Sequence, residues 1–260
     1  MKDKSKSLEK RQSRMWLLLS VLIGIGFWTI LSIIPKTSRV FPNIIEVTKQ
    51  IPIMIERDIF FKDIGSSLIS IFAGYGLGFV FSLPIAILMA WYKPVRKIVE
   101  PWIQFVRNIP PLAYVPLVVI GAGVGRKPQI IVITLATFLT MSIIIYSGII
   151  NIDDTLIKAA KVLGATDKDI FFHVLAPASL PFILTAIRLG ASVALTTLVA
   201  AESTGAFAGL GMRIRSLNNN FETKPMLLYI ITIGIIGLII EKLIKLLERK
   251  LTGWQEKRVL

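Results

Sequence analysis

Long apolar runs constrain this chain more than any other feature of its sequence. The first run, residues 15–34, has no Asp, Glu, Lys or Arg, and a helix of that length crosses about 30 Å of hydrocarbon. Five further runs follow, at 64–92, 108–125, 128–152, 174–201 (interrupted only by Arg188) and 226–240. The sequence therefore predicts an all-α polytopic membrane protein with about six transmembrane helices.

Two of these runs are less regular than the others. The third contains Pro110, Pro111 and Pro116, and proline interrupts helical hydrogen bonding. The sixth is short, so we expect its helix to continue through Glu241 into the amphipathic segment that ends at Leu251.

The composition supports a membrane protein and excludes several other classes. Of the 260 residues, 54% are hydrophobic and 18% are charged, whereas a soluble domain has about 25% charged residues. These values exclude a soluble enzyme, a disordered protein and a secreted disulfide scaffold. The chain has no cysteine and one histidine, so we predict no catalytic residues and no metal site. It also lacks a G-x-x-x-x-G-K-[ST] motif, so we expect no ATP binding by a P-loop.

The distribution of positive charge predicts the orientation. With the N-terminus in the cytoplasm, nineteen Lys and Arg fall on cytoplasmic segments, against ten on external ones. The cytoplasmic segments are 1–14, 93–107, 153–173 and 241–260, and the external ones are 35–63, 126–127 and 203–224. The positive-inside rule then places both termini in the cytoplasm. The net charge of +14 is interpreted as contact with the headgroups of the lipid bilayer rather than with nucleic acid.

The segment between the fourth and fifth runs predicts two short helices. Asp154 or Thr155 can cap the first, which Gly164 ends, and Thr166 can cap the second, which Pro177 would end. The first helix presents a small apolar surface made of Ala159, Ala160, Val162 and Leu163. Such a surface outside the membrane indicates either a docking site for a partner or an elbow at the membrane interface. The residues alone leave both interpretations open.

This segment resembles the EAA loop of binding-protein-dependent ABC importer permeases. The family pattern is Glu-Ala-Ala, three residues, Gly, nine residues, an aliphatic residue and, after one more, Leu-Pro. The matching positions here are Lys158, Ala159, Ala160, Gly164, Val174, Ala176 and Pro177. Further matches lie at 107–116, 121–125, 201–202 and 209–211. Together they are similar to the sulfonate, taurine and nitrate branch of these permeases, over residues 65–247.

The resemblance implies the type I ABC importer permease fold in the cell membrane of a prokaryote. Two permease copies, expected to be identical, would form the path, and an extracytoplasmic binding protein would deliver the solute. A cytoplasmic ATPase dimer would bind ATP and Mg²⁺ and drive alternating access, so this chain would bind no cofactor and would not be an enzyme. The residues that would couple it to the ATPase are Lys158, Ala159, Ala160, Leu163, Gly164, Ala165, Val174 and Pro177.

The chain is expected to contain five segments. In order, these are a cytoplasmic basic leader (1–14), an extra N-terminal transmembrane helix (15–34), an external loop with an interfacial helix (35–63), the permease core with its coupling loop at 153–177 (64–247) and a cytoplasmic tail (248–260). In the external loop, apolar residues at helical spacing predict a helix over 43–60, which Pro52 would kink or split.

Four positions depart from the family pattern. Lys158 replaces a glutamate, Ala176 replaces a leucine, Ser70 stands where an arginine is expected, and Ala186 where a glycine is expected. If the family glutamate makes a charged contact with the ATPase, this chain has to use another contact or a partner of different charge.

Polar residues at membrane depth are candidates for the translocation path. Hydroxyl groups can replace part of the hydration of a solute, but they also hold helices together, and both roles stay open. The candidates are Tyr114, Thr137, Thr140, Tyr146, Thr196, Thr197 and Glu202. For Glu202, a helix-end carboxylate in water is the alternative. Gly74 and Gly78, four residues apart, predict close packing of helices.

Other transport classes fit the sequence less well. An ion-gradient-driven secondary transporter usually has ionisable groups at the membrane midplane or repeated broken helices, and this sequence offers no midplane carboxylate and no internal repeat. An ion-gradient-driven secondary transporter is nevertheless kept as the alternative function. A membrane enzyme lacks a catalytic set. The solute stays open among a sulfonate, taurine, nitrate, a bicarbonate-like anion and a pyrimidine precursor.

Overall fold

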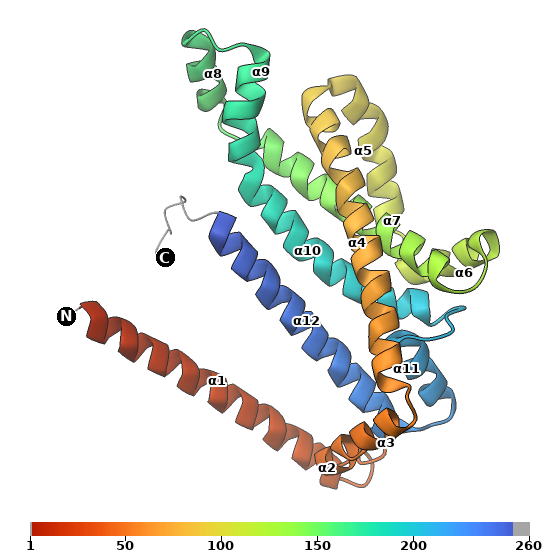
Figure 1. Ribbon diagram of the computed structural model, residues 1–260. Coiled ribbons are helices and arrows are strands. Elements are labelled where there is room, and N and C mark those ends of the chain that lie inside the picture. Colours follow the sequence, from red (N-terminus) through yellow and green to blue (C-terminus); the bar gives the residue numbers. More distant parts are fainter. Residues whose placement is uncertain (1, 252–260) are drawn as a thin grey trace. The chain divides into compact units, whose positions relative to one another are not determined.

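The computed structural model describes residues 2–251 and the side chains of these residues apart from 2–11, 13 and 14. All regular structure in this range is helical, which confirms the predicted all-α class (Figure 1). The helices are α1 (Lys2–Ile33), α2 (Ile44–Thr48), α3 (Gln50–Glu56), α4 (Phe60–Trp91), α5 (Lys93–Arg107), α6 (Pro111–Ala122), α7 (Arg126–Ile150), α8 (Asp154–Val162), α9 (Asp167–Asp169), the π-helix η1 (Ile170–Leu175), α10 (Ala176–Glu202), α11 (Leu210–Asn219) and α12 (Thr223–Leu251). Residues 252–260 of the predicted tail lie outside the described residues.

The apolar runs correspond to helices long enough to cross a membrane. Five stretches among the described residues qualify by length and hydropathy, namely Met15–Ile33, Phe60–Trp91, Arg126–Ile150, Asp167–Glu202 and Thr223–Leu251. A sixth results if α5 and α6, bent by 101° at a short break, count as one span. The prediction of about six spans is therefore confirmed.

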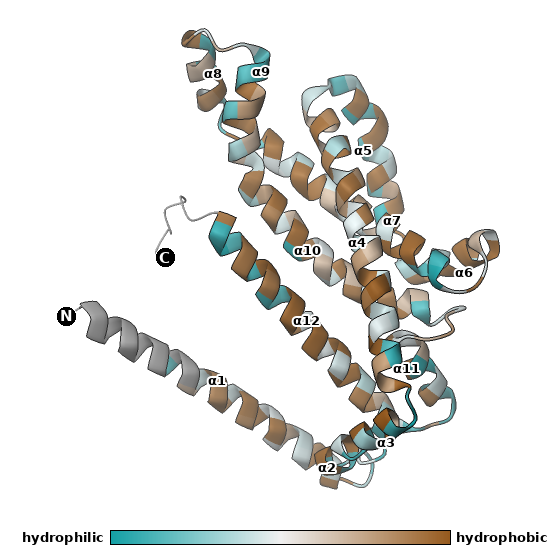
Figure 2. Ribbon diagram, viewed as in Figure 1, coloured by the Kyte–Doolittle hydropathy of each residue, from teal (hydrophilic) through white to brown (hydrophobic). Residues whose placement is uncertain are grey.

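Hydrophobic residues prevail along α10 and α12, and hydrophilic residues gather in α9 and at the start of α5 (Figure 2).

The third predicted span is the second half of this broken pair. The sequence predicts a connection at 93–107, but this segment forms the 15-residue helix α5. Pro110 and Pro111 explain the break, because each lacks a backbone N–H and the residue before a proline is driven out of the helical conformation. Pro110 has ψ 134°, and Pro111 then opens α6, a position that tolerates proline.

The sixth predicted span is longer than its apolar run. α12 continues past Glu241 to Leu251, and the Lys245 ammonium lies 2.6 Å from the Glu241 carboxylate one turn earlier. The expected extension of this helix is therefore confirmed.

The chain divides into two compact units. The first contains α1, α2, α3 and Ser216–Tyr229, and the second holds the described residues from 61 to 215 and from 230 onward. In the first unit, the predicted basic leader and first span are one continuous helix, α1. The Trp28 indole N–H donates to the Pro42 carbonyl at 2.9 Å.

The external loop forms two short helices rather than one. α2 ends at Thr48 and α3 begins at Gln50, so the division lies before Pro52. Pro52 occupies the first turn of α3, where its missing N–H costs no hydrogen bond. The Asn43 side chain caps α2 by accepting from the Ile45 N–H at 3.0 Å.

In the second unit, glycines bring helices into close contact. α7 and α10 run side by side (Figure 1), and a Cβ added at Gly148 of α7 would overlap Phe182 of α10. Gly74 and Gly78 of α4 lie in the same way against Ile133 and Thr137 of α7. The predicted packing role of these two glycines is confirmed.

Replacing Gly78 by alanine should destabilise the packing of α4 against α7 in the second unit. The added Cβ would overlap the Thr137 side chain, and overpacking costs about 1–3 kcal/mol. Gly76→Ala is the matched control, because nothing lies within 4 Å of a Cβ there and both changes improve helix propensity equally. Heating each detergent-purified variant and following its size-exclusion peak should give a lower midpoint for Gly78→Ala alone. Equal midpoints would contradict the proposed helix contact.

Candidate functional site

A cavity of about 240 Å³ lies where the break between α5 and α6 faces α7 and α10. Four of the seven predicted path residues line it: Tyr114 on α6, Thr140 on α7, and Thr196 and Thr197 on α10. Residues far apart in the sequence therefore meet around one small space.

The hydroxyl groups of this cavity differ in what they can still bind. Thr140 donates to the Ala136 carbonyl at 3.0 Å, and Thr196 donates to the Val193 carbonyl at 3.0 Å. Thr197 is 2% exposed, and its hydroxyl has no hydrogen-bond partner among the described residues. A buried hydroxyl without a partner is costly, so Thr197 is the group here that gains most from a bound solute.

Two other predicted path residues lie in helix packing instead. Thr137 is fully buried, donates to the Ile133 carbonyl at 2.7 Å and packs against Gly78. Tyr146 is buried within the apolar core cluster of the second unit. Neither is among the residues that line the cavity.

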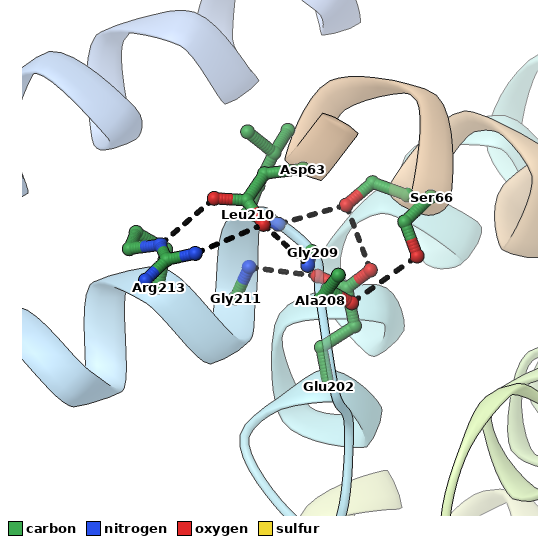
Figure 3. Close-up of polar contacts among 9 residues, drawn as sticks. Asp63, Ser66, Glu202, Ala208, Gly209, Leu210, Gly211 and Arg213 are labelled. Carbon is green, nitrogen blue, oxygen red and sulfur yellow. Dashed lines mark hydrogen bonds and ion pairs between the residues drawn. The ribbon is translucent and has the colours of Figure 1, made fainter. Parts of the chain in front are cut away.

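Glu202, the last predicted path residue, lies in a buried polar network at the end of α10 (Figure 3). Its Oε1 accepts from the Ser67 hydroxyl at 2.7 Å, and its Oε2 accepts from the Gly211 N–H at 2.7 Å. Its side chain is 0% exposed, so the alternative of a carboxylate in water does not hold. It also lies outside the cavity lining.

This network satisfies the first backbone N–H groups of α11. The Gly209 N–H donates to Asp63 Oδ1 at 3.0 Å, and the Leu210 N–H donates to Ser67 Oγ at 2.9 Å. The Arg213 guanidinium, one turn into α11, donates to Asp63 Oδ2 at 2.8 Å and balances part of the negative charge. Helix N-termini favour carboxylates, because their first N–H groups lack partners within the helix. α4, α10 and α11 are thereby joined at one point.

The predicted elbow between the fourth and fifth spans is present. Asp153 caps α8 by accepting from Thr155, and these hydrogen bonds, from the side chain and then the backbone, lower the pKa of the Asp153 carboxyl. At the other end, Gly164 has φ +81°. The Gly164 N–H donates to the Lys161 carbonyl and the Ala165 N–H to the Ala160 carbonyl, each at 3.0 Å. This Schellman motif confirms that Gly164 ends the helix.

The second elbow helix does not end at Pro177, so that prediction is wrong. A capping box between Thr166 and Asp169 starts it as expected. It then continues through η1 into α10, and Pro177 falls in the first turn of α10. Wider π-helical turns displace the regular i→i+4 pattern, so the missing proline N–H can be accommodated without a break. The elbow and α10 are one continuous element.

One side of α8 is packed and its tip is exposed. Ile157, Ala160 and Ala165 pack against the cluster of Ile152, Ile170 and Leu175. Val162 and Leu163 at the tip are each 87% exposed. Among the other predicted coupling residues, Lys158, Ala159, Gly164 and Pro177 are exposed, and Val174 is half-buried.

Comparison with known proteins identifies the family. Residues 82–253 match the family described as "Binding-protein-dependent transport system inner membrane component". The chain belongs to this family.

Curated relatives agree with this assignment. The permease is 40% identical over 240 residues to a probable ABC transporter permease protein of Brucella abortus (strain 2308), covering 92% of this chain and 95% of the relative. It is 36% identical over 193 residues to the taurine transport system permease protein TauC of Escherichia coli (strain K12), covering 74% and 70%. The predicted resemblance to the sulfonate, taurine and nitrate branch is confirmed.

A solved structure supports the fold. The permease matches a chain of the MetNI methionine ABC transporter with a TM-score of 0.66 at 20% identity, covering 77% of this chain and 98% of the other. At this identity the match shows the fold alone, which is the predicted type I importer permease fold. The permease is thus a multi-pass inner-membrane protein.

Two of the four positions that depart from the family pattern are buried. Ser70, where arginine is expected, is fully buried and donates to Gln129 Oε1 at 2.8 Å, a setting that suits a short polar side chain. Ala186, where glycine is expected, is fully buried in the core cluster that α4, α5, α7 and α10 form. Nothing in the structure explains Lys158, Ala176 or the change to alanine at 186.

The sequence did not reveal Asp63, Ser67 and Arg213 as members of the buried network that contains Glu202. They lie more than 130 residues from Glu202 or on the far side of a glycine-containing loop. The available signal was Gly209–Leu210–Gly211 after the fifth span, whose backbone N–H groups require acceptors.

Asp63, which is buried, and Arg213, which is partly buried, should be strongly coupled in stability. Asp63 is 1% exposed at its side chain, whereas the Glu46 and Lys224 side chains, which form a pair in the first unit, are each about half exposed. In double-mutant cycles, we expect about 1.5–3 kcal/mol of coupling for Asp63→Asn with Arg213→Gln. For Glu46→Gln with Lys224→Gln we expect about 0–1 kcal/mol.

Unfolding of the purified permease in mixed micelles with increasing SDS fraction gives these free energies. Coupling for Asp63 and Arg213 no larger than that of the exposed pair would contradict the role assigned to the network.

Proposed function

We propose that this permease and a second copy of itself form the translocation path of an ATP-driven importer for a small polar or anionic solute. A separate ATPase dimer in the cytoplasm binds ATP and Mg²⁺, and an extracytoplasmic binding protein delivers the solute. The permease binds no cofactor and catalyses no reaction. Both of its termini lie in the cytoplasm, as the distribution of Lys and Arg favours. The taurine permease among its relatives supports a small polar solute that carries an anionic group such as a sulfonate.

The observation that carries this proposal is the exposed apolar tip of α8. Val162 and Leu163 are almost fully exposed, although large apolar side chains outside the membrane favour a covering partner. The opposite side of α8 is packed against η1 and the end of α7, so this packing holds the exposed tip in place. In this family the ATPase is the partner implied at that position.

The connection from the elbow to the cavity supports coupling. Since η1 continues into α10, a displacement of α8 moves the start of α10. The same helix carries Thr196 and Thr197 at the cavity. ATP-driven closure of the ATPase dimer draws two elbows together and shifts the two-state bundle between inward and outward access.

Truncating the α8 tip should weaken ATPase binding. Leu163→Ser removes an apolar side chain that is 87% exposed, and Leu17→Ser on α1, at 64% exposure, is the matched control. Truncating an interface hot spot costs at least about 2 kcal/mol, or about thirtyfold in affinity. Quantifying the ATPase that co-purifies with each tagged variant should show a loss for Leu163→Ser alone. Equal recovery from both would exclude the tip as the docking site.

The turn at Gly164 gives a second test. Its φ of +81° suits glycine, is tolerated by asparagine and is strained for a β-branched residue. Gly164→Val should therefore lower the amount of bound ATPase, and Gly164→Asn should retain most of it. Similar recovery for both variants would contradict the assignment. If no variant, nor the native chain, binds an ATPase, the ion-gradient-driven class becomes the better explanation.

A further inference from the structure

The break between α5 and α6 brings two sources of positive potential to one cavity. Arg107 is the last residue before the break and lines the 240 Å³ space together with Pro111, the first residue of α6. α6 has no side-chain cap at its N-terminus, so its first backbone dipoles point positive charge toward the break.

The charge lining this cavity is of one sign. Arg107 is the only charged side chain among its lining residues. No described carboxylate lies within ion-pair distance of its guanidinium. An arginine stays protonated in proteins and offers five N–H donors in a planar fork that matches carboxylates, sulfonates and phosphates. A cavity built in this way attracts anions and disfavours cations.

A third group points to a ligand independently of charge. The Thr197 side chain is 2% exposed, lines the same cavity and has a hydroxyl with no partner among the described residues. The hydroxyl groups of Thr140 and Thr196 donate to helix carbonyls, so their oxygen atoms are left to act as acceptors. The cavity thus offers hydrogen-bond donors from Arg107 and Thr197 and hydrogen-bond acceptors from Thr140 and Thr196. Pockets for drug-sized ligands have volumes of about 300–1,000 Å³, so this smaller cavity suits a smaller solute.

From this geometry we infer that the α5–α6 break is an anion-recognition site inside the permease. Arg107 binds the oxyanion group of the solute, the α6 N-terminus adds favourable potential, and Thr197 donates to the bound group. The inference rests on the proposed transport function and adds the position and the residues that recognise the solute. A neutral solute would leave the guanidinium without a counter-charge, so the site discriminates against it. The occupant is a soluble anion rather than a lipid headgroup.

The absence of cysteine from the sequence allows a direct test on the full chain. Thr196→Cys places a single thiol at the cavity, and Thr48→Cys places one at an exposed position of α2 outside it. Each variant is reacted with anionic 2-sulfonatoethyl methanethiosulfonate and cationic 2-(trimethylammonium)ethyl methanethiosulfonate. The ratio of the two rates cancels differences in thiol ionisation and reports the local potential.

We expect this anionic-to-cationic ratio at Thr196→Cys to exceed that at Thr48→Cys by about tenfold or more. Arg107→Gln should reduce the ratio at Thr196→Cys toward that of the control and leave Thr48→Cys unchanged. Arg107→Lys should retain most of the selectivity, since it keeps the charge. Arg107 is exposed, and the size-exclusion profile of each variant verifies that it folds.

A solute that protects the Thr196→Cys thiol from modification identifies the chemical class of the occupant. Millimolar ethanesulfonate should slow the modification of Thr196→Cys, and neutral ethyl methyl sulfone should not. In nanodiscs with phosphatidylglycerol the ratio at Thr196→Cys, divided by that at Thr48→Cys in the same nanodiscs, should match the value in dodecyl maltoside. A loss of this relative selectivity would show that a lipid headgroup occupies the site and would overturn the inference. An anionic-to-cationic ratio at Thr196→Cys equal to that at Thr48→Cys, no effect of Arg107→Gln, or a thiol unreactive to both would also overturn it.

These rates require neither an ATPase nor a binding protein. Equal ATPase recovery from the α8 variants and their controls would therefore contradict the proposed function without touching the anion site. Loss of charge selectivity would contradict the anion site alone.

Discussion

A backbone N–H or C=O that is buried in protein or in hydrocarbon has to find a partner within the protein. This constraint shapes each place where the chain departs from a continuous helix. Beyond α10, the N–H groups that open α11 are taken up by Asp63, Ser67 and Glu202. At the α5–α6 break, Pro110 and Pro111 remove two donors that would otherwise need acceptors. At the elbow, the π-helix η1 leads directly into α10, and Pro177 in the first turn of α10 does not end the helix.

The same constraint explains what the sequence could and could not predict. The spans were predictable, because uninterrupted apolar runs have no other stable structure in a membrane. Gly164 was predictable as the end of α8, since a helix with a Schellman motif favours glycine at that position. Pro177 was misinterpreted, because proline ends a regular helix and the π-helical turn that accommodates it has no sequence signature.

The candidate site was predictable only in part, because it depends on which helices meet. Tyr114, Thr140, Thr196 and Thr197 meet at one cavity. Thr137, by contrast, faces Gly78 of a neighbouring helix, which hydropathy cannot indicate. The family motif that contains Arg107 was visible, but its place beside a cavity depends on the 101° bend that follows.

α10 links the parts of the proposed mechanism. It starts at the elbow, passes the cavity at Thr196 and Thr197, and ends at Glu202. At 1.5 Å per residue, its 27 residues extend over about 40 Å. The close glycine contacts with α7 favour movement of α7 and α10 as a packed pair. A displacement of α8 can therefore be transmitted along α10 to the cavity and to the polar network around Glu202.

The most direct test of the central claim, that the elbow couples a separate ATPase to this path, is the composition of the complex in its own membrane. The tagged chain is purified in mild detergent, and the proteins that accompany it are quantified by mass spectrometry. We predict a P-loop ATPase at about one copy per permease, as in a symmetric assembly of two of each. Recovery of the chain without an ATPase, together with no ATPase crosslinked from Lys161 in intact membranes, would contradict it.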